Sequence, residues 1–282
     1  SEFEKYEIGA ARAACEAIPA TMRARSWKDQ FGVYPDSQLG PEMARGLARE
    51  ACYARAAAAL SSSNHGARLA WRWHPMRVLD MSCSLGRPRY LSADRAEDQK
   101  WLKYGVGGCY SRGFDFLVRN DRIFDPTQTH YEYGLLLASC RFEGPQTDLT
   151  EFAKAECLDQ GRMFLLQDTD LRLLAVGCQE PRRRGDFTSV ARCFESGLGF
   201  LRAYERPSGS PARATRYTLG LMLSAFTAPS DLTTREKMAA SALASLLKQE
   251  TGPLAEIARA CQGAPGRCLE IIGQRYGTAA GQ

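Results

Sequence analysis

The chain has 282 residues, 44% hydrophobic and 24% charged, a composition typical of a folded protein with a sizeable core. Its 37 basic and 32 acidic residues give a net charge of +5 without a dense basic stripe, which argues against a nucleic-acid-binding protein. No apolar run approaches the roughly 18 residues that a membrane-spanning helix needs. The polar start, Ser1-Glu2-Phe3, contains no signal peptide, so we expect that any export signal has been removed.

The first part of the chain predicts two helices. Apolar side chains recur at helical spacing over residues 4–24, and an Ala-rich segment of high helix propensity runs from Pro41 to about Leu60. Cys15 and Cys52 lie on these two helices, and an antiparallel arrangement would bring them together. We therefore expect an N-terminal helical hairpin over residues 4–64.

The segment 65–128 has no single periodicity and is predicted to be an irregular linking region. Alternation over 70–73 favours a strand and a short helix remains open, while Pro75 is expected to interrupt any regular element. Tryptophan and arginine are frequent at binding hot spots, although core packing of the tryptophans is the alternative. The candidate binding residues in this region are Trp71, Arg72, Trp73, His74 and Arg77.

A quasi-repeat of helix, turn and helix occurs three times in the third region, residues 129–276. The repeats pair residues 131–140 with 148–160, 171–178 with 190–201, and 217–223 with 234–247. Each has a small residue early in its first helix and an aspartate in the cap position of its second: Gly134 and Asp148, Ala175 and Asp186, Gly220 and Asp231. A further helical pair is predicted from Pro253 to Tyr276.

These patterns predict a mainly α fold in which helical hairpins form an irregular, solenoid-like array. An α+β fold remains the alternative. Its strands would be 162–166 with 171–176, or 217–226, which contain apolar runs long enough for a hairpin.

Ten cysteines are spread along the chain, and structural disulfides are the favoured interpretation. Three pairs flank predicted turns, where a disulfide would staple a hairpin: Cys140 and Cys157, Cys178 and Cys193, and Cys261 and Cys268. Cys83 and Cys109 complete the expected set. Local loop entropy favours pairing between nearest neighbours, although other pairings and free thiols remain open. No CxxC or CxxH spacing occurs, so no metal site is predicted.

The segment Leu171-Arg172-Leu173-Leu174-Ala175, followed by Gly185-Asp186-Phe187 and Ala191-Arg192-Cys193-Phe194, resembles a repeat of the tetratricopeptide and Sel1-like families. The resemblance covers about residues 129–250. It implies an array that binds another protein and, as in some secreted Sel1-like proteins, a disulfide in each hairpin. In the periplasm or outside the cell, it further implies an immunity or inhibitor protein that neutralises a secreted antibacterial effector.

No motif predicts an enzyme, a catalytic residue or a cofactor. His65, His74 and His130 have no ligand spacing and no GxSxG elbow is present. A cell-wall glycan hydrolase that uses Glu132 and Glu143 remains an alternative, because such enzymes need only carboxylates. An envelope assembly scaffold is a third possibility.

A basic run, Arg182-Arg183-Arg184, follows Pro181 in a predicted turn. It is the second candidate binding segment, and a solvated turn is the alternative interpretation.

Overall fold

The computed structural model describes residues 2–17, 49, 52–60, 74–85, 107–120, 129–142, 146, 148–165, 169–247 and 252–278. Within these ranges the regular structure is helical and no strand occurs. The chain forms two compact units, Ser1–Leu165 and Leu166–Gln282. The division between them falls inside the third predicted region, residues 129–276.

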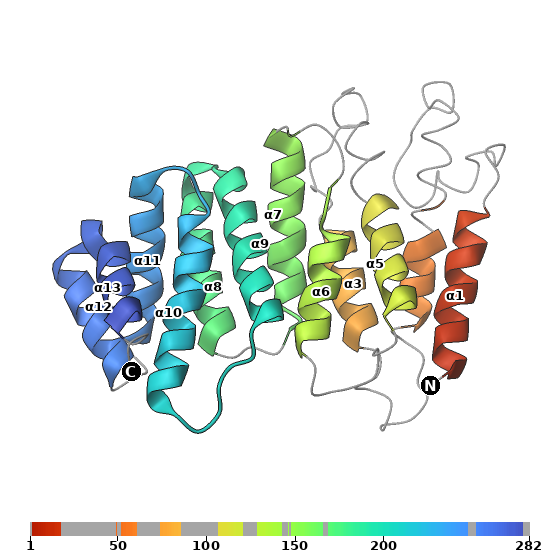
Figure 1. Ribbon diagram of the computed structural model, residues 1–282. Coiled ribbons are helices and arrows are strands. Elements are labelled where there is room, and N and C mark those ends of the chain that lie inside the picture. Colours follow the sequence, from red (N-terminus) through yellow and green to blue (C-terminus); the bar gives the residue numbers. More distant parts are fainter. Residues whose placement is uncertain are drawn as a thin grey trace. The chain divides into compact units, whose positions relative to one another are not determined.

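Unit 1 is built from helical hairpins that pack one on the next (Figure 1). Its helices are α1 (Glu2–Glu16), α3 (His74–Leu85), α5 (Gly107–Arg119), α6 (Thr129–Ser139) and α7 (Asp148–Arg162), with further helical residues at 52–60. Helix α5 packs against α1 and α6, and α3 packs against α6 and α7.

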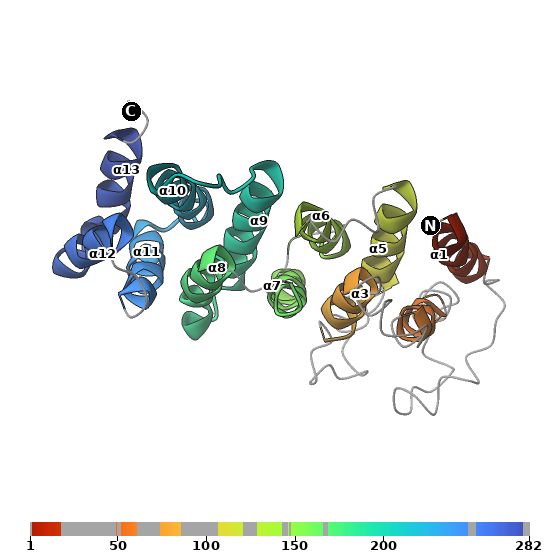
Figure 2. The ribbon, with the colours of Figure 1, turned by 90° about the horizontal axis from the view of Figure 1, so that it is seen from below.

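Unit 2 consists of three successive hairpins, seen end-on in Figure 2. Its helices are α8 (Thr169–Gln179), η3 (Pro181–Arg184), α9 (Phe187–Ala203), α10 (Pro211–Thr227), α11 (Leu232–Leu246), α12 (Pro253–Gly263), η4 (Pro265–Arg267) and α13 (Cys268–Thr278). Each hairpin packs on its neighbour, because α8 contacts α11, α9 contacts α10, and α10 contacts α13.

The predicted mainly α fold is confirmed. All three predicted repeats are helical hairpins: α6 with α7, α8 with α9, and α10 with α11. The α+β alternative is wrong for 171–176 and 217–226, which lie inside α8 and α10. Asp186 and Asp231 cap α9 and α11 as predicted, since each carboxylate accepts a hydrogen bond from a backbone N–H three residues on.

The expectation that Pro75 interrupts regular structure is wrong. Pro75 is the second residue of α3, which continues to Leu85. Proline is tolerated in the first turn of a helix because its missing N–H would have no partner within the helix there, and its fixed φ suits the helix.

All ten cysteines form disulfides, and the pairing is between nearest neighbours along the chain. The bridges are Cys15–Cys52, Cys83–Cys109, Cys140–Cys157, Cys178–Cys193 and Cys261–Cys268. Each joins the two helical segments of one hairpin, while the α10–α11 hairpin has none. The stapled hairpins predicted from the cysteine spacing are therefore confirmed.

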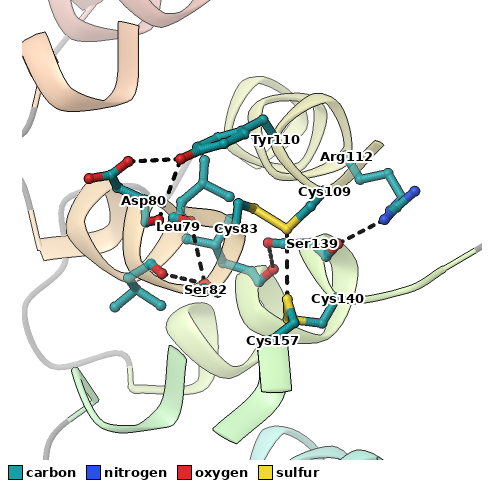
Figure 3. The surroundings of a disulfide bond; sticks show 12 residues. Leu79, Asp80, Ser82, Cys83, Cys109, Tyr110, Arg112, Ser139, Cys140 and Cys157 are labelled. Carbon is teal, nitrogen blue, oxygen red and sulfur yellow. Dashed lines mark hydrogen bonds between the residues drawn. A yellow bond between two sulfur atoms is a disulfide. The ribbon is translucent and has the colours of Figure 1, made fainter. Parts of the chain in front are cut away.

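Two disulfides of unit 1 touch each other in its core. The Sγ atom of Cys109 lies 3.7 Å from the Sγ atom of Cys157, so the bridge between α3 and α5 rests on the bridge between α6 and α7 (Figure 3). Both sulfurs are buried, and Arg112 of α5 donates a hydrogen bond of 3.0 Å to the backbone oxygen of Ser139 beside them. The contact joins consecutive hairpins at their staples.

Glycines permit close helix packing inside unit 2. A Cβ atom on Gly177 of α8 would lie 2.3 and 2.4 Å from ring atoms of Phe226 and 3.2 Å from the backbone oxygen of Met238. All three residues are buried. Neither the ring nor the backbone has free space into which to move, so α8 approaches α10 and α11 only because residue 177 lacks a side chain.

We expect the substitution Gly177→Ala to lower the free energy of unfolding of unit 2 by about 1–3 kcal/mol, the usual cost of overpacking a core. Gly273→Ala in α13 is the matched control, because its Cβ would meet nothing within 4 Å. The control should be neutral or gain up to about 1 kcal/mol from helix propensity. Chemical denaturation of both variants measures the difference, and equal stabilities would contradict the packing argument.

Candidate functional site

A surface groove of about 810 Å³ lies in unit 2. Its lining comes from the last two turns of α9, the loop that follows, one face of α10, and Tyr276 of α13. Figure 2 shows that α10 lies between α9 and α13. The lining residues are Ser196, Gly199, Phe200, Ala203, Tyr204, Glu205, Pro207, Arg213, Arg216, Tyr217, Gly220, Leu223, Ser224 and Tyr276.

Aromatic rings form a connected cluster in the groove. The ring of Phe200 lies 4.7 Å from that of Tyr204 and 5.2 Å from that of Tyr217, measured between centroids. Tyr204 remains 58% exposed, so its ring faces solvent rather than the core. The cluster therefore offers an accessible apolar surface.

Gly220 of α10 leaves room for this arrangement. A Cβ at that position would lie 3.0 Å from the Phe200 ring and 3.4 Å from the Tyr276 ring. The repeat pattern placed this small residue early in its helix, whereas it is the tenth residue of α10. There it lets two aromatic side chains approach the helix backbone.

The loop between α9 and α10 is held in place by polar contacts. Arg206 forms an ion pair of 2.7 Å with Asp170 of α8, whose carboxylate is 1% exposed and also accepts a hydrogen bond of 3.0 Å from Thr218. The hydroxyl of Tyr217 donates a hydrogen bond of 3.1 Å to the backbone oxygen of Tyr204. This loop wall of the groove is therefore anchored to both α8 and α10.

Two arginines lie on the α10 side of the groove, one helical turn apart. The guanidinium of Arg216 lies over the ring of Tyr276, 5.5 Å from its centroid. Neither Arg213 nor Arg216 forms an ion pair with a carboxylate of the described residues. The groove combines an aromatic surface with two cations available to a ligand.

The sequence-predicted binding residues of the aromatic segment are placed only in part. Trp71, Arg72 and Trp73 lie outside the described residues. His74 is the first residue of α3. Arg77 is exposed on α3, with its guanidinium 5.8 Å from the ring centroid of Phe164. All of these positions belong to unit 1, whereas the groove belongs to unit 2.

The predicted basic run forms η3, between α8 and α9. Burial lowers the pKa of Arg182. Arg183 is 81% exposed and lies 3.5 Å from Glu180, and Arg184 is exposed. The run precedes α9, whose first residue Phe187 lies about 14 Å along the helix axis from Ser196, the first lining residue of that helix. The structure does not bring it together with the groove.

One of the two carboxylates of the hydrolase alternative lies within the described residues. Glu132 lies in the first turn of α6, where a carboxylate favours the helix dipole, and Glu143 falls outside the described residues. His130 of α6 packs edge-on against the ring of Tyr133, and His65 falls outside the described residues. Across the described ranges no cluster of His, Cys, Asp or Glu has the geometry to hold a metal ion.

A second polar cluster surrounds Glu16 in unit 1. One carboxylate oxygen accepts hydrogen bonds from Arg49 at 2.6 Å, Tyr53 at 2.7 Å and Ser111 at 3.0 Å. Burial would raise the pKa of Glu16, but these bonds and the charge of Arg49 outweigh it and hold the pKa below its ordinary value. Because the cluster links α1, the helical segment around Tyr53 and α5 beside the Cys15 bridge, it acts as a structural tie.

The lowered pKa of Glu16 predicts a pH dependence of stability. The contribution of ionised Glu16 to the free energy of unfolding is complete above the unfolded-state pKa of about 4.3. It is lost as the pH falls through the lower folded-state pKa. We expect unit 1 to lose stability below about pH 4.3, and Glu16→Gln to flatten that part of the profile. Denaturation curves between pH 3 and 7 check this; an unchanged profile in the variant would show that other carboxylates govern it.

Sequence reasoning missed the groove residues. Phe200, Tyr217 and Tyr276 come from three helices spread over 77 positions, and their meeting depends on how hairpins stack. The helix predicted for this repeat, residues 217–223, does not include the arginines; Arg213, Arg216 and Tyr217 share one face of α10, which begins at Pro211.

No helix in the described part of the chain is both long and apolar enough to cross a membrane. The five disulfides fit a compartment outside the reducing cytoplasm.

Comparison of the chain with protein-family models, curated proteins and solved structures finds no match, so its resemblance to tetratricopeptide and Sel1-like repeats stays a prediction.

Proposed function

We propose that the protein is a non-enzymatic protein-binding module of the periplasm or cell exterior, and that the unit 2 groove is its binding surface. The composition of the lining carries the proposal: three tyrosines and two arginines, residue types enriched at the hot spots of protein interfaces. Stacked helical hairpins expose extended surfaces of this kind without a titratable catalytic group.

The disulfides support the proposed compartment. Ten cysteines without a free thiol are typical of exported proteins, because cytoplasmic thiols are kept reduced. The finer proposal is an inhibitor that neutralises a secreted antibacterial effector. Its support is the sequence resemblance to Sel1-like repeats, which is an argument by family analogy.

A cross-linking experiment tests the proposed function. A photo-reactive amino acid replaces Tyr204, the exposed groove ring. The oxidised protein is then incubated with envelope and secreted fractions of bacterial cultures. A cross-linked partner is then identified, purified and titrated calorimetrically with the unmodified protein. We expect a complex of defined stoichiometry that Tyr204→Ala and Tyr217→Ala weaken at least tenfold, since hot-spot side chains contribute 2 kcal/mol or more.

Exposed substitutions away from the groove, such as Arg259→Ala in α12, provide the control and should leave the affinity unchanged. If the purified partner is a toxic enzyme, its activity should fall in proportion to the complex formed. Hydrolysis of purified peptidoglycan that Glu132→Gln abolishes would instead contradict the proposal and establish the hydrolase alternative.

A further inference from the structure

We propose that the groove binds an acidic segment of another polypeptide, whose bulky apolar side chain packs on the aromatic cluster while its carboxylates meet Arg213 and Arg216. This inference rests on the proposed function, because it specifies the partner that the groove takes. Three features of the groove support it: its aromatic surface, its two arginines without an ion pair to a described carboxylate, and its anchored wall.

The aromatic surface favours a ligand with an apolar anchor. The rings of Tyr204 and Tyr217 each lie within 5.2 Å of the ring of Phe200, measured between centroids. Tyr204 keeps more than half of its surface in solvent. Covering this surface with an aromatic or aliphatic side chain removes apolar area from water and adds ring contacts. A purely charged ligand would leave it uncovered.

The arginines favour carboxylates. A guanidinium presents a planar fork of donors that matches a carboxylate in two parallel hydrogen bonds. Arg216 is already oriented by the ring of Tyr276 below it, and Arg213 is exposed one turn before it on α10. Since neither is paired with a described carboxylate, an acidic ligand would meet both without displacing an existing ion pair.

The one acid of the lining sets the orientation of the ligand. Glu205 follows Tyr204 in the loop, so the lining has two positive charges against one negative charge. Its carboxylate disfavours acidic groups next to the loop. We therefore place the apolar anchor against the loop and the carboxylates against α10.

The wall of the groove is preorganised. Arg206 and Tyr217 hold the loop through the buried Asp170 and the backbone of Tyr204. Because this wall is already fixed in the free protein, binding orders few protein groups, which lowers the entropic cost of association.

Fluorescence anisotropy with labelled peptides tests the inference. The acidic probe is Gly-Glu-Glu-Phe-Leu-Gly, and its analogues replace both glutamates with glutamine or lysine. The proteins are wild type, the double variant Arg213→Glu with Arg216→Glu, and a matched control, Arg192→Glu with Arg259→Glu, which makes the same charge change at exposed sites outside the lining. A second double variant, Arg213→Gln with Arg216→Gln, removes the two positive charges without adding negative ones. Circular dichroism checks that each variant is folded.

We expect the acidic probe to bind wild type at least tenfold tighter than the lysine analogue, and more weakly at higher salt because added ions screen the charges. The double variant Arg213→Glu with Arg216→Glu should weaken binding of the acidic probe at least tenfold. The control double variant should weaken it less than twofold. Tyr204→Ala should weaken it several-fold.

Three results would overturn the inference. The first is equal affinity for all three peptides in wild type, with binding lost in Tyr204→Ala. The groove would then bind polypeptides without charge selection, and the proposed function would stand. Absence of peptide binding, while a purified partner still binds through the groove, overturns only the acidic ligand. Binding of a peptidoglycan disaccharide-peptide in place of the acidic probe overturns the inference and the proposed function together.

Discussion

Loss of the three disulfides of unit 1 is expected to unfold that unit while unit 2 keeps much of its structure. The bridges close separate, non-overlapping stretches of the chain, with sequence separations of 37, 26 and 17 residues. Loop-closure entropy predicts about 4, 3.5 and 3 kcal/mol for them, together about 10 kcal/mol. A typical domain has a stability of only about 5–15 kcal/mol, so this loss is of the same size as the whole.

Unit 2 depends less on its bridges. Its two disulfides have separations of 15 and 7 residues, for which the same relation gives about 3 and 2 kcal/mol, and the α10–α11 hairpin needs none. The protein produced in a reducing cytoplasm and the oxidised protein can be compared by hydrogen exchange read by mass spectrometry. Amides of α1 and α5 should lose most of their protection on reduction, and those of α10 and α11 much less. Equal loss in both units, or none in unit 1, would contradict the loop-entropy argument.

The hairpins could be predicted from the sequence because their signals are local. The aspartates before α9 and α11, the apolar spacing of α8 and the proline that opens α12 each act within a few residues of where they occur. Nearest-neighbour cysteine pairing followed from the same locality, since each bridge closes one hairpin.

The groove could not be predicted because its parts are distant in sequence. Phe200, Arg216 and Tyr276 meet only when the hairpins of unit 2 stack, and no local pattern fixes how far one hairpin turns relative to the next. The sequence instead drew attention to the concentrated Trp and Arg segments. Residues that cluster along the chain need not form a site, and residues that form a site need not cluster along the chain. For this reason no function was predicted for the residues of α10.

The contact between two disulfides in unit 1 predicts thiol–disulfide exchange once one cysteine is removed. In Cys83→Ala the thiol of Cys109 loses its partner, and the sulfur of Cys157 lies 3.7 Å away in the wild-type arrangement (Figure 3). The Cys109 thiolate attacks the Sγ atom of Cys157, a new Cys109–Cys157 bond forms, and the electron pair of the broken bond leaves on Cys140. One disulfide and one thiol are present before and after, so no external oxidant or reductant is needed.

The expected product is a measurable fraction of Cys83→Ala molecules with a Cys109–Cys157 bridge and a free Cys140. Because the thiolate is the attacking species and a free cysteine has an ordinary pKa of about 8.5, exchange should be slow near neutral pH and faster in alkaline solution. Alkylation followed by non-reducing peptide mapping identifies which cysteine is labelled over hours.

Cys178→Ala is the matched control, since it frees Cys193 in unit 2, where no second bridge touches the Cys178–Cys193 disulfide among the described residues. In Cys178→Ala the label should stay on Cys193. In Cys83→Ala it should move from Cys109 to Cys140. Label found only on Cys109 after prolonged alkaline incubation would show that the attack cannot align with the Cys140–Cys157 bond. Rigid packing of the two disulfides would then prevent exchange despite their short separation. Exchange needs the attacking sulfur to approach along the axis of the bond that it breaks.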